Sequence, residues 1–305
     1  MPQYLRFDTT LWERAGRKRV RKANVAFTRR TSMRRSVLFA TTLVLTLAFV
    51  VFPAMTFAED DDHDGHAKCA GLPSQQQLKS ALSAVVATHS AGGLNLNMWG
   101  TIVNRDGVVC AIAFTGGNRG DQWPGSRVIS AQKANTANAF SLPGLALSTA
   151  NLYTAVQPGG TLFGLQESNP VDTGVAYGGN SNTYGLPNDA MVGGKIGGVN
   201  VFGGGLALYN AQHQIIGGIG VSGDTSCADH IIAWRTRHAL ILDFVPAGVA
   251  AGNAADIHGT DNIIFDITIN ATGHPVSASG FGHPECSPAS TTAGNALPTT
   301  DPIRH

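Results

Sequence analysis

The sequence IGGIGVSG at residues 216–223 decides the fold class. It lies in an apolar segment at 214–221, which a short polar turn separates from a similar segment at 199–209. Two such segments joined by a short turn predict an antiparallel β-hairpin. Gly218 and Gly220 fall inside the return strand, where the missing side chains let a helix, a backbone or a flat ligand approach closely.

The same glycines match an enzyme motif by spacing alone. Gly218, Gly220 and Gly223 satisfy the G-x-G-x-x-G pattern of dinucleotide-binding sites, and Asp243 lies about 20 residues further on. That pattern needs its glycines in the turn after a parallel strand, so glycines within a hairpin argue against it. A serine nucleophile elbow also fails, because Asp224 stands where the last glycine of G-x-S-x-G is required.

A second hairpin and further helices are predicted around the first. Residues 95–103 alternate apolar and polar side chains, an Asp-Gly turn follows, and residues 108–114 form the apolar return strand, as in a β-hairpin. Ser126 can cap a helix whose small side chains would allow close approach to a sheet, namely Ala131, Ala134, Ala137 and Ala139. Residues 227–241 predict another helix, and 262–269 a further strand. We therefore expect a single α+β domain with an antiparallel sheet flanked by helices.

The first helix of this domain carries a histidine. Ser74 precedes Gln77 by three residues, a capping-box pattern that predicts the start of a helix. The stripe that follows at helical spacing consists of Leu78, Leu82, Val85 and His89, before Gly92 and Gly93 end the helix. His89 thus shares the face expected to be buried, where a lone histidine is more often a core residue than a ligand.

Charge is divided unevenly along the chain. Residues 1–58 hold 11 of the 21 Lys and Arg residues but only Asp8 and Glu13 of the 20 acidic ones, which leaves the remainder with a net charge of −8. Phosphate binding needs a basic face, so this acidic remainder argues against a nucleic-acid partner. With 43% hydrophobic and 13% charged residues, the chain is not disordered throughout.

The basic N-terminal region leads into an uncharged apolar segment at 37–57, directly after Arg34 and Arg35. This pattern predicts a secretory signal peptide within residues 1–58, cleaved after Ala58. The alternative is an uncleaved membrane anchor, since about 20 apolar residues can span a bilayer. We therefore expect an extracytoplasmic protein, periplasmic or secreted, that contacts a membrane only if the leader is retained.

The predicted domain spans residues 72–243. Two further segments flank it, and a third interrupts it. Residues 59–71 are an acidic linker containing histidines, which predicts a solvated tail. Residues 157–200 are rich in Gly and Asn and too long for a simple connection, which indicates an insertion. Residues 244–305 predict a C-terminal extension with one strand and a disordered, Pro/Ser/Thr-rich end.

All four cysteines lie beyond the expected cleavage point, at Cys69, Cys110, Cys227 and Cys286. An oxidising compartment permits disulfides, and four cysteines allow three pairings. No C-x-x-C occurs, so zinc-ribbon and thioredoxin motifs are absent from the sequence. We prefer a Cys69–Cys286 bond, which would tie the ends of the mature chain together.

Three blocks resemble the haem-binding family of the GlcG/HbpS type (DUF336), which includes the glycolate-operon accessory protein, secreted haem-binding sensors and the C-terminal domain of a cobalamin adenosyltransferase. The first block is VNRDG at 103–107, similar to the family's hairpin turn. The second runs from PGS to AQKANTA at 124–137, similar to its small-residue helix. The third is the glycine-rich 203–223 followed by Asp229. Together they cover about residues 72–243.

The resemblance implies a profilin-like or PAS-like three-layer α/β/α fold, haem or a related tetrapyrrole as ligand, and assembly into homo-oligomers. Compared with the family pattern, residues 157–200 are expanded and residues 244–305 have no counterpart.

A haem site needs an apolar slot, an axial donor and cations for the propionates. The resemblance implies an axial histidine borne on a helix, for which His89 is a candidate metal ligand and His230 another. Lys133 lies in the matched helix and could neutralise a propionate. The alternatives are ordinary ones: a capping role at an exposed turn for His230 and a surface position for Lys133.

The sequence therefore predicts an exported haem-binding accessory or sensor protein with no catalytic residues, since no set of nucleophile, base and orienting group is apparent. Two alternatives stay open. One is an enzyme that degrades haem or acts on a small organic acid, and the other is a structural or interaction module that kept the fold without the ligand.

Overall fold

The four long strands of the domain form one antiparallel sheet. The computed structural model describes residues 69–254 and 256–305. Its sheet contains β1 (Trp99–Asn104), β2 (Val109–Phe114), β3 (Gly205–Tyr209) and β4 (Ile215–Ser222), in the order β2-β1-β4-β3. Each pair of neighbours is antiparallel, and Ile102 of β1 lies opposite Ile219 of β4. Both predicted hairpins are confirmed, and their first strands begin several residues later than expected.

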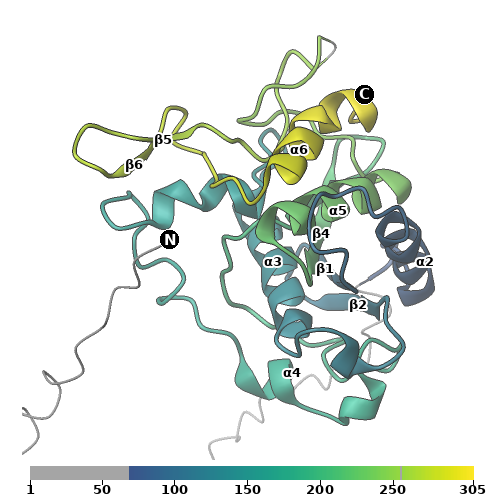
Figure 1. Ribbon diagram of the computed structural model, residues 1–305. Helices are drawn as coiled ribbons and strands as arrows, with labels where there is room; N and C mark the ends of the chain where they lie inside the picture. The colour runs from purple at the N-terminus through teal and green to yellow at the C-terminus, as the bar shows by residue number, and fades with distance from the viewer. Residues whose placement is uncertain (1–68, 255) are drawn as a thin grey trace, which may run out of the picture. The chain divides into compact units, whose positions relative to one another are not determined.

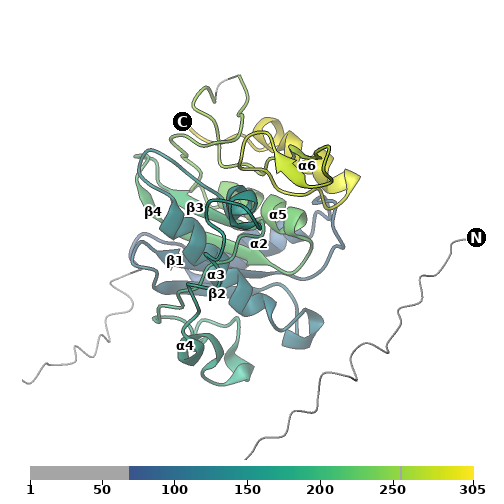
Figure 2. The same cartoon turned by 90° about the vertical axis from the view of Figure 1, so that its left-hand side faces the viewer.

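Helices cover both faces of this sheet (Figures 1 and 2). The helices α2 (Gln75–Val86) and α5 (Ser226–Ala239) pack on one face, where a core cluster joins Leu82 of α2 and Ile231 of α5 to Ile219. The helix α3 (Ser126–Phe140) packs on the other face, against side chains such as Val103. The described residues form one compact unit. The expected single α+β domain with three α/β/α layers is therefore confirmed.

The glycines of β4 allow α3 to approach the sheet closely. A Cβ atom on Gly220 would lie 1.9 Å from the backbone oxygen of Ser130, and one on Gly218 would lie 2.4 Å from that of Ala134. Real side chains do not tolerate such distances, so α3 could not take this position over any other residue type. Thr101 of β1 and Ser130 of α3 add a buried hydroxyl hydrogen bond of 2.7 Å across the same contact.

The first helix begins as predicted and ends earlier. Ser74 caps α2 with a full capping box to Gln77, but the helix stops at Val86, well before the glycines expected to end it. Gly92 instead fits against the backbone at Ser290, where a Cβ would lie 2.4 Å from the amide nitrogen. The two glycines therefore allow chain segments to pack closely and do not terminate the helix.

The glycine-rich insertion at 157–200 is packed against the domain and contains the short helix α4 (Thr173–Tyr177). The Arg127 side chain of α3 and the carboxylate of Asp189 form a buried ion pair, and the guanidinium also stacks 3.6 Å from the ring centroid of Tyr184. These contacts fix the insertion to the α3 side of the sheet.

The C-terminal extension is folded over α5. It contains β5 (Ile267–Ile269), β6 (Pro275–Ser277) and α6 (Pro288–Thr300), and Figure 1 shows α6 beside α5. The predicted strand at 262–269 is present only in its last three residues. The prediction of a disordered end is wrong, because Ser287 caps α6 and the buried Leu297 joins the core cluster on α5.

Two disulfides close the domain, Cys69–Cys110 and Cys227–Cys286. The preferred Cys69–Cys286 pairing is wrong. Cys69 is bonded to Cys110 of β2, and Cys286 of the C-terminal extension is bonded to Cys227 in the first turn of α5. Two disulfides and no free cysteine in the described part of the chain fit an oxidising, extracytoplasmic compartment.

The leader at 1–58, its cleavage site and most of the acidic linker lie outside the described residues. Within the described ranges, no helix combines the length and the apolar character needed to cross a membrane.

Candidate functional site

His89 lies beyond the end of α2 and its side chain is exposed. The backbone there has a φ of 50°, which turns the chain away from the helix. The expectation that His89 shares the buried face of the helix is therefore wrong. No hydrogen bond joins its imidazole to another described residue, so the ring nitrogens are available to a ligand from solvent.

The surface beside His89 is only slightly hollowed. A depression of about 10 Å³ is lined by apolar side chains from α2 and α5, including Val85, Val86 and Ile232. Arg235 also lines the depression. Its guanidinium forms an ion pair with Asp301 at 3.2 Å and donates a hydrogen bond to the Ser90 hydroxyl. An axial donor, apolar contacts and a cation thus occur together here, without space to enclose a macrocycle.

Lys133 is buried inside the domain, with 1% of its surface exposed. Its Nζ donates to the Asp229 carboxylate at 2.7 Å and to the Val221 carbonyl at 3.2 Å. Burial raises the pKa of Asp229 to about 6, and the neighbouring Lys133 charge opposes that rise. The lysine is therefore paired with a protein carboxylate and does not face solvent, where a haem propionate would have to reach it.

His230 is also fully buried, on the inner side of α5. Its Nε2 accepts a hydrogen bond from the Ile263 amide at 3.1 Å, whereas Nδ1 has no partner among the described residues. Burial lowers the pKa of His230 to about 3, so the ring is neutral near pH 7. The alternative of a capping role at an exposed turn is wrong, because His230 is fully buried.

The three histidine and lysine candidates do not converge on one cavity. His89 borders the shallow depression, while Lys133 and His230 line none of the described pockets. The sequence analysis grouped these residues only because the family resemblance implies a haem site. No sequence pattern indicated that the C-terminal extension would cover His230.

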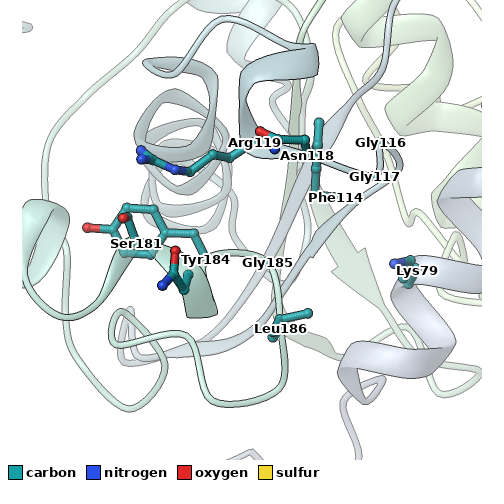
Figure 3. A pocket seen from close by; sticks show the side chains of 11 residues that line it. Lys79, Phe114, Gly116, Gly117, Asn118, Arg119, Ser181, Tyr184, Gly185 and Leu186 are labelled. Atoms are coloured by element: carbon teal, nitrogen blue, oxygen red, sulfur yellow. The ribbon is translucent and has the colours of Figure 1, made fainter.

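A larger cavity that the sequence did not reveal lies at the β2 edge of the sheet (Figure 3). It has a volume of about 300 Å³, and residues of the insertion at 181–186 form one wall. Figure 3 shows Arg119 and Tyr184 on one side and Lys79 on the other, with the Phe114 ring between them. Two cations and two aromatic rings would suit an anionic, partly apolar ligand.

A more apolar groove of about 680 Å³ lies between the segment at 153–160 and the β5–β6 hairpin. Tyr153 and the exposed His274 line it, together with Ile267, Ile269 and Val276. Its size falls within the range of small-molecule sites. The groove belongs to the C-terminal extension and the insertion, the two segments that the sequence analysis set apart.

The chain matches one family model, described as haem degrading protein HbpS-like, over residues 74–237. That match covers more than half of the chain and runs from the first turn of α2 almost to the end of α5. A search of the curated proteins gave no match.

The solved structures that resemble parts of this chain include three proteins. A PduOC–haem complex is 24% identical over 54% of this chain and 89% of its own, with a TM-score of 0.37. The Klebsiella pneumoniae protein ORFY, a DUF336 protein, is 24% identical over 53% and 86%, with a TM-score of 0.36. HbpS is 18% identical over 55% and 89%, with a TM-score of 0.34. These scores are low, so the assignment to a family rests on the family model alone.

Proposed function

The chain belongs to the HbpS-like family, and on that premise we propose that it is an exported protein that binds haem or a related tetrapyrrole as an accessory or sensor. The observation that carries the proposal is the family match over residues 74–237, which includes both hairpins and all three helices packed on the sheet. Two disulfides support the exported location, because such bonds persist in oxidising compartments.

His89 is the residue we propose as axial ligand. An imidazole with free ring nitrogens fits this role, and the apolar side chains of Val85, Val86 and Ile232 lie beside it. The depression is too small to enclose a macrocycle, so haem would lie against the outer surface with one face on His89. A second copy of the chain could then cover the other face, consistent with the proposed homo-oligomer.

Hemin titration of two single variants tests this position. We expect His89→Ala to shift or abolish the Soret band of the complex, because the axial nitrogen is lost. His258→Ala is the matched control, since His258 is an exposed histidine far along the sequence from α2 and should leave the band unchanged. Equal spectra for both variants would reject His89 as the ligand.

The family's description favours a second function, oxidative degradation of haem. Haem would supply the iron that activates oxygen, and an external reductant would supply electrons. The haem complex is incubated with a reductant and oxygen, and loss of the Soret band with an open-chain product and free iron supports turnover. A band that persists under these conditions supports binding alone, and failure of any hemin binding favours the ligand-free module.

A further inference from the structure

The first turn of α5 brings two sulfur atoms and an imidazole together. Cys227 lies in this turn, and Cys286 and His283 come from the C-terminal extension. The Sγ atoms of the two cysteines and a ring nitrogen of His283 all lie within 4.8 Å of one another. Within the described ranges, no other group of three or more His, Cys, Asp or Glu residues gathers so closely.

Hydrogen bonds fix the tautomer of His283. Its Nδ1 lies 2.7 Å from the Pro284 carbonyl oxygen, which can only accept, so Nδ1 carries the proton. The unprotonated Nε2 accepts from the Ser226 hydroxyl at 2.7 Å. A neutral imidazole whose second nitrogen donates to a carbonyl is the usual state of a metal-bound histidine.

The start of α5 adds an electrostatic contribution at one of the two sulfurs. Cys227 is the second residue of a 14-residue helix, where the helix N-terminus stabilises negative charge. The Cys227 amide already donates to the sulfur of Cys286 at 3.2 Å. Cys286 is exposed, so a reductant and a metal ion can both reach it from solvent.

We propose that Cys227, His283 and Cys286 form a redox-gated site for Zn²⁺. In the oxidised chain the disulfide occupies both sulfurs and no metal binds. A dithiol reductant opens the disulfide by giving two electrons and two protons, and is itself oxidised to a disulfide. Zn²⁺ then displaces the two thiol protons into solvent and takes two thiolates and a ring nitrogen of His283, leaving a fourth position for water.

The two sulfurs are bonded to each other in the oxidised chain and must move apart after reduction to hold a metal ion. Zinc bonds to sulfur and nitrogen at about 2.0–2.3 Å, so donors in a tetrahedral site lie roughly 3.3–3.8 Å apart. The three donors are within 4.8 Å before any movement. Two of the three ligands, His283 and Cys286, lie beyond the family match, and the site does not depend on haem binding.

Cobalt(II) is the spectroscopic probe for this site, since it gives thiolate charge-transfer absorption in a site of this kind. We expect the reduced chain to bind one Co²⁺, Zn²⁺ to displace it, and the oxidised chain to show no band. Cys69→Ser/Cys110→Ser removes the other disulfide and should keep the site. Cys227→Ser/Cys286→Ser should lose the band, and His283→Asn, which keeps both sulfurs, should weaken Zn²⁺ binding by about tenfold or more.

A second measurement uses the wild-type chain, so its result does not depend on whether the variants fold. Zinc is loaded onto the reduced chain, the excess is removed, and an oxidant is added while a chromophoric chelator reports free metal. Release of one zinc per chain as the disulfide re-forms supports the site. The proposal is overturned if the reduced chain binds no stoichiometric metal, if oxidation releases none, or if the Cys227→Ser/Cys286→Ser variant binds as the wild type does.

Discussion

The Nζ of Lys133 lies 2.7 Å from Oδ2 of Asp229, and both side chains are buried. This pair joins α3 on one face of the sheet to α5 on the other. The second carboxylate oxygen of Asp229 accepts from the amides of Gly223 and Asp224, so the pair also holds the turn that follows β4. The matched lysine of the small-residue helix therefore has a structural role in connecting the layers.

Loss of this lysine should destabilise the domain strongly. Lys133→Met leaves a buried carboxylate without its cation, and breaking a buried pair in this way costs about 3–5 kcal/mol. Urea unfolding measures the loss, with the exposed Lys79→Met as control, expected within about 0.5 kcal/mol of the wild type. Lys133→Met/Asp229→Asn should cost less than Lys133→Met alone. Equal effects of Lys133→Met and Lys79→Met would contradict the role of the pair.

The close packing of α3 on β4 can be tested at one glycine. Gly220→Ala places a Cβ against two backbone atoms of α3, which cannot move independently of the helix. We expect a loss of about 1–3 kcal/mol in the free energy of unfolding. Gly144→Ala is the control, because nothing lies within 4 Å of a Cβ there, and it should change stability by less than about 1 kcal/mol. A neutral Gly220→Ala would show that the helix has room to shift.

Acid should destabilise the domain through His230. Its pKa is about 3 in the folded chain and 6.5 unperturbed, so the unfolded chain binds more protons between these values. Stability is full above pH 6.5 and falls as the pH drops towards 3, by up to about 1.4 kcal/mol per pH unit for one proton. His283 acts in the same direction and Asp229 in the opposite one.

The His230→Gln variant separates this contribution from the others, because Gln does not titrate and can still accept from the Ile263 amide. Its free energy of unfolding, measured by urea titration from pH 4 to 7, should fall less steeply than that of the wild type. Parallel curves would mean that His230 contributes nothing to the acid sensitivity.

Peptide mapping under non-reducing conditions checks the disulfide pattern. Digestion should release linked peptides for Cys69–Cys110 and for Cys227–Cys286. Removing the second bond as Cys227→Ala/Cys286→Ala should cost about 2–5 kcal/mol, because the unfolded chain gains conformational freedom. A peptide linking Cys69 to Cys286 would contradict the arrangement of the C-terminal extension.

The sheet and its close helix could be predicted because the signals are local. Apolar segments joined by short turns define both hairpins, and the glycines of β4 together with the alanines of α3 indicate close packing before any contact is known. The capping box at Ser74 likewise fixes one end of α2. The other end was missed, because His89 continues the helical spacing by coincidence after the helix has ended at Val86.

The candidate site depends on contacts between distant residues, which no local pattern encodes. Asp229 lies 96 residues from Lys133, and the Ile263 amide that binds His230 lies 33 residues further along the chain, in the C-terminal extension. The cysteine pairs were equally undetermined, since pairing depends on which Cα atoms the fold brings close. Composition suggested a disordered end, whereas Ser287 and Leu297 order it through one cap and one buried contact.

Hemin binding by the purified wild-type chain is the most direct test of the proposed function. The protein is titrated with hemin and the Soret absorbance is followed to saturation against a matched buffer titration. The account predicts a saturable band at one haem per chain. A linear rise without saturation would contradict it and leave the fold as a module without its family's ligand.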